Sequence, residues 1–71
     1  MTLPTWHRLM ESVSFIENLG YEFSITESRV KINHNTDKSN ANILDTQWDT
    51  TKQEAVFLAL QEFEKIEGIL L

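Results

Sequence analysis

The spacing of apolar residues changes from a helical period to a strand period near residue 20, and back again near residue 50. Between residues 4 and 19 the apolar residues recur three and four positions apart, on one face of a helix: Trp6, Leu9, Met10, Val13, Ile16 and Leu19. Pro4 suits the first turn of this helix, where its missing N–H has no partner to lose. Gly20 follows the last apolar residue, so it is predicted to end the helix in a left-handed conformation.

Three short segments then alternate apolar and polar residues, as β-strands with one buried side do. The predicted inward-facing residues are Tyr21, Phe23 and Ile25 in the first segment, Val30 and Ile32 in the second, and Leu44, Thr46 and Trp48 in the third. Glu27-Ser28 leaves room for a tight hairpin, although the Asn-Gly pair that favours one is missing. Residues 35–42 are rich in Asn, Ser and Asp, which predicts an exposed connection.

A second amphipathic helix is predicted after Asp49. Thr50 with Gln53, or Thr51 with Glu54, makes a capping box at its start. Its predicted apolar face consists of Ala55, Val56, Ala59, Leu60, Phe63, Ile66 and Leu70. The order helix-strand-strand-strand-helix, in a single domain over residues 1–71, predicts an α+β two-layer sandwich. We expect a three-stranded antiparallel sheet with both helices on one face, because the connections are too short for parallel crossovers.

The composition of the chain excludes several kinds of functional site and partner. The chain has no cysteine, which excludes disulfides, thiolate metal sites and thiol nucleophiles. Eleven acidic and six basic residues give a net charge of −5, and the only basic cluster is Arg29, Lys31 and Lys38, so nucleic acid is an unlikely partner. The longest apolar run, residues 55–60, is too short to span a bilayer, and the N-terminus does not resemble a signal peptide. We therefore expect a cytoplasmic protein without a membrane partner.

No residue pattern predicts catalysis, a metal or a cofactor. His7 and Glu11 lie one helical turn apart, and an exposed ion pair is the expected reading. His34 ends a strand beside a polar loop, which favours a surface role. Residues 37–42 resemble a calcium loop but have Ala41 and Asn42 where a ligand and a glycine are needed. The sequence predicts that this is not an enzyme.

Two phenylalanines lie off the apolar faces of the two helices. Phe15 is about 130° from the centre of the first apolar face, and Phe57 lies similarly far from the second, while Leu58 is on the other flank. Aromatic anchors among polar groups are typical of protein-binding surfaces. The predicted interface consists of Phe15, Phe57, Leu58, Gln61 and Glu64, with both rings in one patch. The open alternative is that a wide apolar face, or a slight rotation of each helix, buries both rings.

The element order and length resemble the double-stranded-RNA-binding domain. In that family the second helix opens with a lysine-rich segment that binds phosphates, whereas the matching residues 50–55 contain one lysine, Lys52, and a nearby glutamate, Glu54. The resemblance implies a similar fold without the RNA-binding residues.

Two segments are similar to small α-β-α sandwich proteins of phages and prophages. Residues 19–25, LGYEFSI, match a helix that ends in a Gly-aromatic pair before a strand, and residues 54–60, EAVFLAL, match a closing helix rich in Ala and Leu. This likeness implies a phage-type accessory protein.

Two functions remain open. The first is a small acidic, non-enzymatic protein-interaction module, such as a phage-type accessory or inhibitor protein, that binds an unidentified protein partner or a second copy of itself as a homodimer. The alternative is an RNA-binding module with the shape of the double-stranded-RNA-binding domain.

Overall fold

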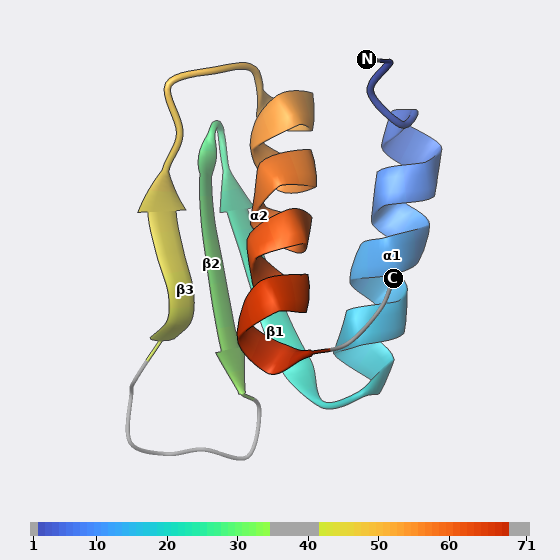
Figure 1. Ribbon diagram of the computed structural model, residues 1–71, viewed down its shortest axis with the longest axis vertical. Coiled ribbons are helices and arrows are strands. Elements are labelled where there is room, and N and C mark those ends of the chain that lie inside the picture. Colours follow the sequence, from blue (N-terminus) through green and yellow to red (C-terminus); the bar gives the residue numbers. More distant parts are fainter. Residues whose placement is uncertain (1, 35–41, 69–71) are drawn as a thin grey trace.

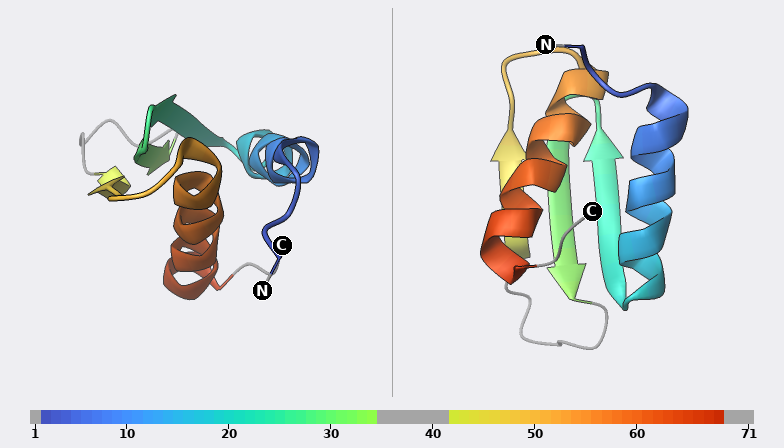
Figure 2. Two further views of the ribbon diagram at one scale, coloured as in Figure 1. Left: turned by 90° about the horizontal axis from the view of Figure 1, so that it is seen from above. Right: turned by 45° about the vertical axis from the view of Figure 1, so that its right-hand side comes forward.

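The computed structural model describes residues 2–34 and 42–68. Its elements are α1 (Trp6–Asn18), β1 (Tyr21–Thr26), β2 (Arg29–His34), β3 (Asn42–Gln47) and α2 (Lys52–Glu67). The strands form an antiparallel sheet in the order β1-β2-β3, with α1 packed against β1 and α2 against β2 and β3 (Figure 1). Both helices lie on one side of this sheet (Figure 2). The predicted α+β sandwich is confirmed, while the connection predicted over residues 35–42 lies almost entirely outside the described residues.

Each helix begins at a threonine. Thr5 Oγ1 accepts a hydrogen bond from the backbone N–H of Arg8, so α1 starts at Trp6. Pro4 therefore lies before the N-cap and not in the first turn, which corrects the predicted helix start. Of the two capping boxes predicted for α2, the structure uses that of Thr51, whose side chain accepts a hydrogen bond from the backbone N–H of Glu54.

The β1–β2 hairpin is as tight as predicted. Thr26 pairs with Arg29, so Glu27 and Ser28 alone form the turn. Glu27 takes a φ of 53°, a conformation that glycine would adopt without strain. The unfavourable residue at this turn is tolerated because Val30 and Ile32 of the following strand are fully buried and fix the register.

The core lies between the helices and β2. Its fully or nearly fully buried residues are Leu9, Val13, Ile16, Val30, Ile32, Ala55, Val56, Ala59, Leu60 and Phe63. Tyr21, Phe23, Ile25, Leu44 and Trp48 pack against it while partly buried, which confirms the predicted inward sides of the strands.

Three residues of the predicted apolar faces lie outside the core. Trp6 is 39% exposed, Leu19 is 47% exposed and Ile66 is 49% exposed. Each lies at an end of its helix, where less of the sheet is available to cover it. Leu70, predicted on the same face as Ile66, lies outside the described residues.

Gly20 ends α1 with a φ of 103°, in the left-handed half of the backbone map. A Cβ at this position would meet no atom within 4 Å, so substitution strains the backbone alone. Gly20→Ala should therefore lower the free energy of unfolding by about 1 kcal/mol. Chemical denaturation measures this change, and Gly20→Asn, which tolerates positive φ better, should lose less. An unchanged midpoint for the alanine variant would contradict this helix end.

The rotation of α2 is tested by a pair of its residues. Phe63 is fully buried, so Phe63→Ala should cost about 3–5 kcal/mol of unfolding free energy through lost contacts and a cavity. Ile66 is half exposed, and Ile66→Ala should cost only about 1 kcal/mol. Equal losses in the two variants, measured by thermal and urea unfolding, would show that α2 is rotated about its axis.

Candidate protein-binding groove

The two helices enclose a half-open groove of about 260 Å³. Its lining residues come from both helices and from the segment before α1: Pro4, Arg8, Leu9, Ser12, Phe57, Leu60, Gln61 and Glu64. Leu9 and Leu60 belong to the core, so the floor of the groove is the edge of the apolar interior. Ser12, Gln61 and Glu64 add hydroxyl, amide and carboxyl groups beside that floor. The groove therefore combines an apolar base with hydrogen-bonding walls.

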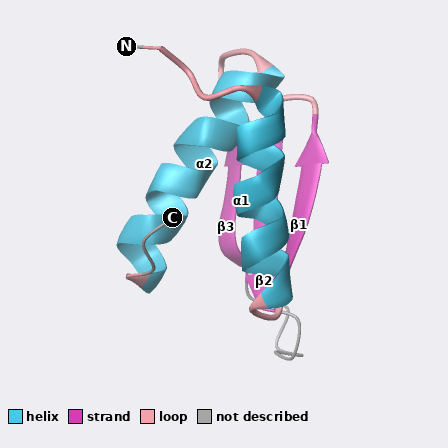
Figure 3. Ribbon diagram, turned by 90° about the vertical axis from the view of Figure 1, so that its right-hand side faces the viewer, coloured by secondary structure: helices cyan, strands magenta, loops and turns pink. Residues whose placement is uncertain are grey.

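The helices are tied together at their N-terminal ends. Gln53 Nε2 donates a hydrogen bond to the backbone oxygen of Pro4 at 2.6 Å, and the Lys52 ammonium lies 5.5 Å from the centre of the Trp6 ring. Further along, α1 and α2 diverge, as Figure 3 shows. The groove exists because the helices are held together at one end and separate toward the other.

The C-terminal end of α2 is tied to the sheet. Tyr21 of β1 donates a hydrogen bond from its hydroxyl to Glu67 Oε1 at 3.1 Å. Its ring packs edge-on against Phe63 and His34, with centroids 5.0 and 4.9 Å away. Desolvation, followed by the hydrogen bond and the charge of Glu67, raises the pKa of Tyr21. These contacts tie the end of α2 to the first residue of β1.

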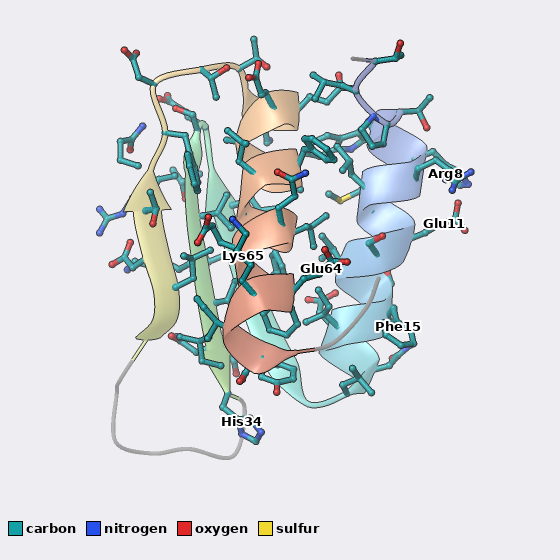
Figure 4. The ribbon with its side chains drawn as sticks, in the orientation of Figure 1. Arg8, Glu11, Phe15, His34, Glu64 and Lys65 are labelled. Atoms are coloured by element: carbon teal, nitrogen blue, oxygen red, sulfur yellow. The ribbon has the colours of Figure 1, made fainter. Side chains whose placement is uncertain are left out.

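The structure brings together three of the five predicted interface residues. Phe57, Gln61 and Glu64 line the groove. Phe15 lines a different, shallow surface on α1 and projects away from α2, whereas Glu64 lies between the two helices (Figure 4). Leu58, one residue after Phe57, is turned by about 100° around α2 and is half buried. The five residues therefore do not form the single patch that the sequence suggested.

The two phenylalanines differ in burial. Phe15 is 49% exposed, whereas Phe57 is half buried and packs against the core. The alternative that both rings are covered is thus wrong for Phe15 and partly right for Phe57. The sequence analysis missed Arg8 and Ser12 as groove residues, because helical spacing gives the apolar face of α1 but not the flank that meets α2.

The basic cluster on the open side of the sheet is partly neutralised. Arg29 donates from Nε and from a terminal nitrogen to the two carboxyl oxygens of Asp45, at 2.9 and 3.0 Å. This hydrogen bond, with smaller attractions from Arg29 and Lys31, lowers the pKa of Asp45 despite some desolvation. Lys38, the third member of the cluster, lies outside the described residues.

The remaining polar candidates are surface features. His7 and Glu11 form the expected exposed pair, with nitrogen and oxygen 3.3 Å apart. Within residues 2–34 and 42–68, no three His, Asp or Glu side chains are close enough to hold a metal. The same residues contain no helix long and apolar enough to cross a membrane.

Comparisons with protein-family models, curated proteins and solved structures found no match to this chain. The resemblances to the double-stranded-RNA-binding domain and to the phage proteins therefore remain predictions.

The Arg29–Asp45 pair predicts a specific titration behaviour. Because the pKa of Asp45 is lower in the folded than in the unfolded chain, its stabilising contribution is present above the unfolded pKa and is lost as pH falls through the folded pKa. Arg29→Gln should raise the pKa of Asp45 toward its ordinary range and weaken this dependence, as NMR titration of the carboxyl carbon will show. Lys31→Gln should have a smaller effect, and an unchanged pKa in Arg29→Gln would contradict the pairing.

Proposed function

We propose that this chain is a small protein-binding module that holds a segment of a partner protein in the groove between α1 and α2, and that it acts by binding and not by catalysis. The observation that supports this proposal is the groove itself, which brings Phe57, Gln61 and Glu64 beside Ser12 of α1. Apolar floors with polar rims are what specific protein contacts use.

The dimensions of the groove fit an apolar anchor. An enclosed apolar cavity of about 150 Å³ accommodates a benzene molecule. The groove of about 260 Å³ therefore has room for one large apolar side chain. The half-open shape suits a side chain that enters from a partner's surface, because the partner's backbone can stay outside.

The polar walls indicate what surrounds the anchor. Glu64 lies between the helices and carries a negative charge on a chain whose net charge is −5 (Figure 4). A partner segment with a lysine or arginine near its apolar anchor would pair with this carboxylate. Gln61 and Ser12 offer further hydrogen bonds to the partner's backbone. The proposed ligand is thus a segment of another protein that carries an apolar side chain beside a lysine or arginine. The segments that resemble phage proteins favour an accessory or inhibitor role in the cytoplasm.

The RNA-binding alternative has weaker support. Arg29 uses two of its donors on Asp45, which reduces the positive charge that the open face of the sheet offers to phosphates. Gel-shift titration at low salt tests it, and a steeply salt-dependent complex would favour RNA binding over the groove proposal.

Two serines on α1 give a matched test of the groove. Ser12 lines the groove, whereas Ser14 lines the surface beside Phe15. Ser12→Phe should fill the groove and abolish partner binding, and Ser14→Phe should leave it intact. The readout is photo-crosslinking in a cell lysate from a benzophenone side chain placed at Gln61, with each purified variant added as competitor before irradiation.

The expected result is a cross-linked partner that Ser14→Phe competes away as well as the wild type does, and that Ser12→Phe does not. Circular dichroism and urea unfolding of both variants confirm that each is folded. Competition by Ser12→Phe but not by Ser14→Phe would show that the partner binds the surface beside Phe15 and not the groove. The absence of any cross-linked protein would also contradict the groove proposal.

A further inference from the structure

The outer edge of β3 differs from the outer edge of β1. The strand order β1-β2-β3 leaves β3 paired with β2 alone. Helix α1 runs beside β1, at that end of the sheet, whereas no described element runs along the far side of β3 (Figure 1, Figure 2). Uncovered edge strands offer backbone N–H and C=O groups to an additional strand.

The pairing pattern shows which residues turn their backbone groups outward. Just beyond the end of the β2–β3 ladder, the N–H of Trp48 donates to the backbone oxygen of Ser28 at 2.9 Å, which continues the pairing by one residue. In antiparallel sheets these groups alternate, so Leu44 and Thr46 also direct their backbone groups toward β2. The backbone groups of Asp45 and Gln47 then point to the outer edge.

A bulge limits the usable length of this edge. The β2–β3 register shifts at Ile32/Asn33, which distorts the beginning of β3. The regular part of β3 runs from Leu44 to Gln47, and the bond from Trp48 to Ser28 extends the paired stretch by one residue, so that its middle residue is Thr46. A segment that pairs symmetrically and antiparallel with a copy of itself is therefore centred on Thr46.

We propose that the chain associates with a second copy through β3, with Thr46 opposite Thr46 of the other copy, to form one continuous six-stranded sheet. In this register Asp45 lies opposite Gln47 of the second copy, and the two residues exchange their outward N–H···O bonds. The same exchange occurs on the other side of the twofold axis. The groove between α1 and α2 is not part of this contact.

Charge selects this register over its neighbour. Centring the pair on Asp45 would set two carboxylates directly opposite each other, which is unfavourable. Centring it on Thr46 places each Asp45, already bound by Arg29, against an uncharged amide. On the helix side, Leu44 faces Trp48 of the second copy, and both of these residues are only half buried in the single chain. The added contact covers apolar surface that one copy leaves partly exposed.

A pair of charge changes at Gln47 tests the register. Gln47 is exposed, and its amide nitrogen donates to Ser28 Oγ at 2.9 Å, an interaction that both variants replace, so that the two differ in the sign of the new charge. Gln47→Lys places a cation opposite Asp45 of the second copy and should lower the dimer dissociation constant about fivefold, whereas Gln47→Glu should raise it about fivefold. Sedimentation equilibrium over a wide concentration range measures the constant. The contact is small, so the wild-type dissociation constant should fall between about 1 μM and 1 mM.

The folding stability of the single chain should change in the opposite direction. Gln47 pairs with Arg29 across the β2–β3 ladder, so Glu stabilises and Lys destabilises the fold at low concentration. Ser24→Lys and Ser24→Glu, on the same open side of β1, control for the change in net charge. The proposal is overturned if the wild type stays monomeric at about 1 mM. Equal effects at residues 24 and 47, or shifts of the same sign for Lys and Glu at residue 47, overturn it as well.

Discussion

The structure depends on how two helices share a narrow sheet. The axes of the first and last of three strands lie only about 10 Å apart, and two packed helices also lie about 8–10 Å apart. Each helix therefore covers only part of the sheet. Helix α2 packs on β2 and β3, and α1 packs on β1. The groove between the helices and the uncovered edge of β3 both follow from this arrangement.

Both ends of α2 contact other parts of the fold. Gln53 and Lys52 contact Pro4 and Trp6 and so hold the start of α2 beside the start of α1. Tyr21 of β1 binds Glu67 and holds the end of α2. If α2 followed α1 along its whole length, Leu9 and Leu60 would close over the gap. The two helices meet at their first turns and diverge further along, and the apolar floor between them stays accessible.

Much of the fold was predictable from the sequence because local signals agree with the overall packing. The capping threonine of α2, Gly20 and the change of apolar period each mark an element boundary that the structure confirms to within two residues, whereas the cap at Thr5 was not predicted. Burial at the helix ends was not predictable. Ile66 has the correct spacing for the core, but a 16-residue helix of about 24 Å is longer than a six-residue strand of about 20 Å. Its last turn therefore extends beyond much of the sheet.

The site was predictable only in part, for a related reason. Distance from the centre of an apolar face identifies off-face residues such as Phe15 and Phe57, but it does not say which flank meets the other helix. Only the position of α1 relative to α2 separates Phe57, in the groove, from Phe15, on the outer surface. Ser12, a small polar residue with no distinguishing pattern, could not have been identified at all.

Methyl NMR can detect whether the apolar floor between the helices is accessible. In a titration with a small apolar alcohol such as cyclohexanol, the methyl resonances of Leu60 and Leu9 should shift with saturation. Those of Val30 and Ile32, which belong to β2 and are buried between the sheet and the helices, should stay in place. Unchanged leucine resonances, or equal shifts at all four residues, would show that no apolar floor is accessible between the helices.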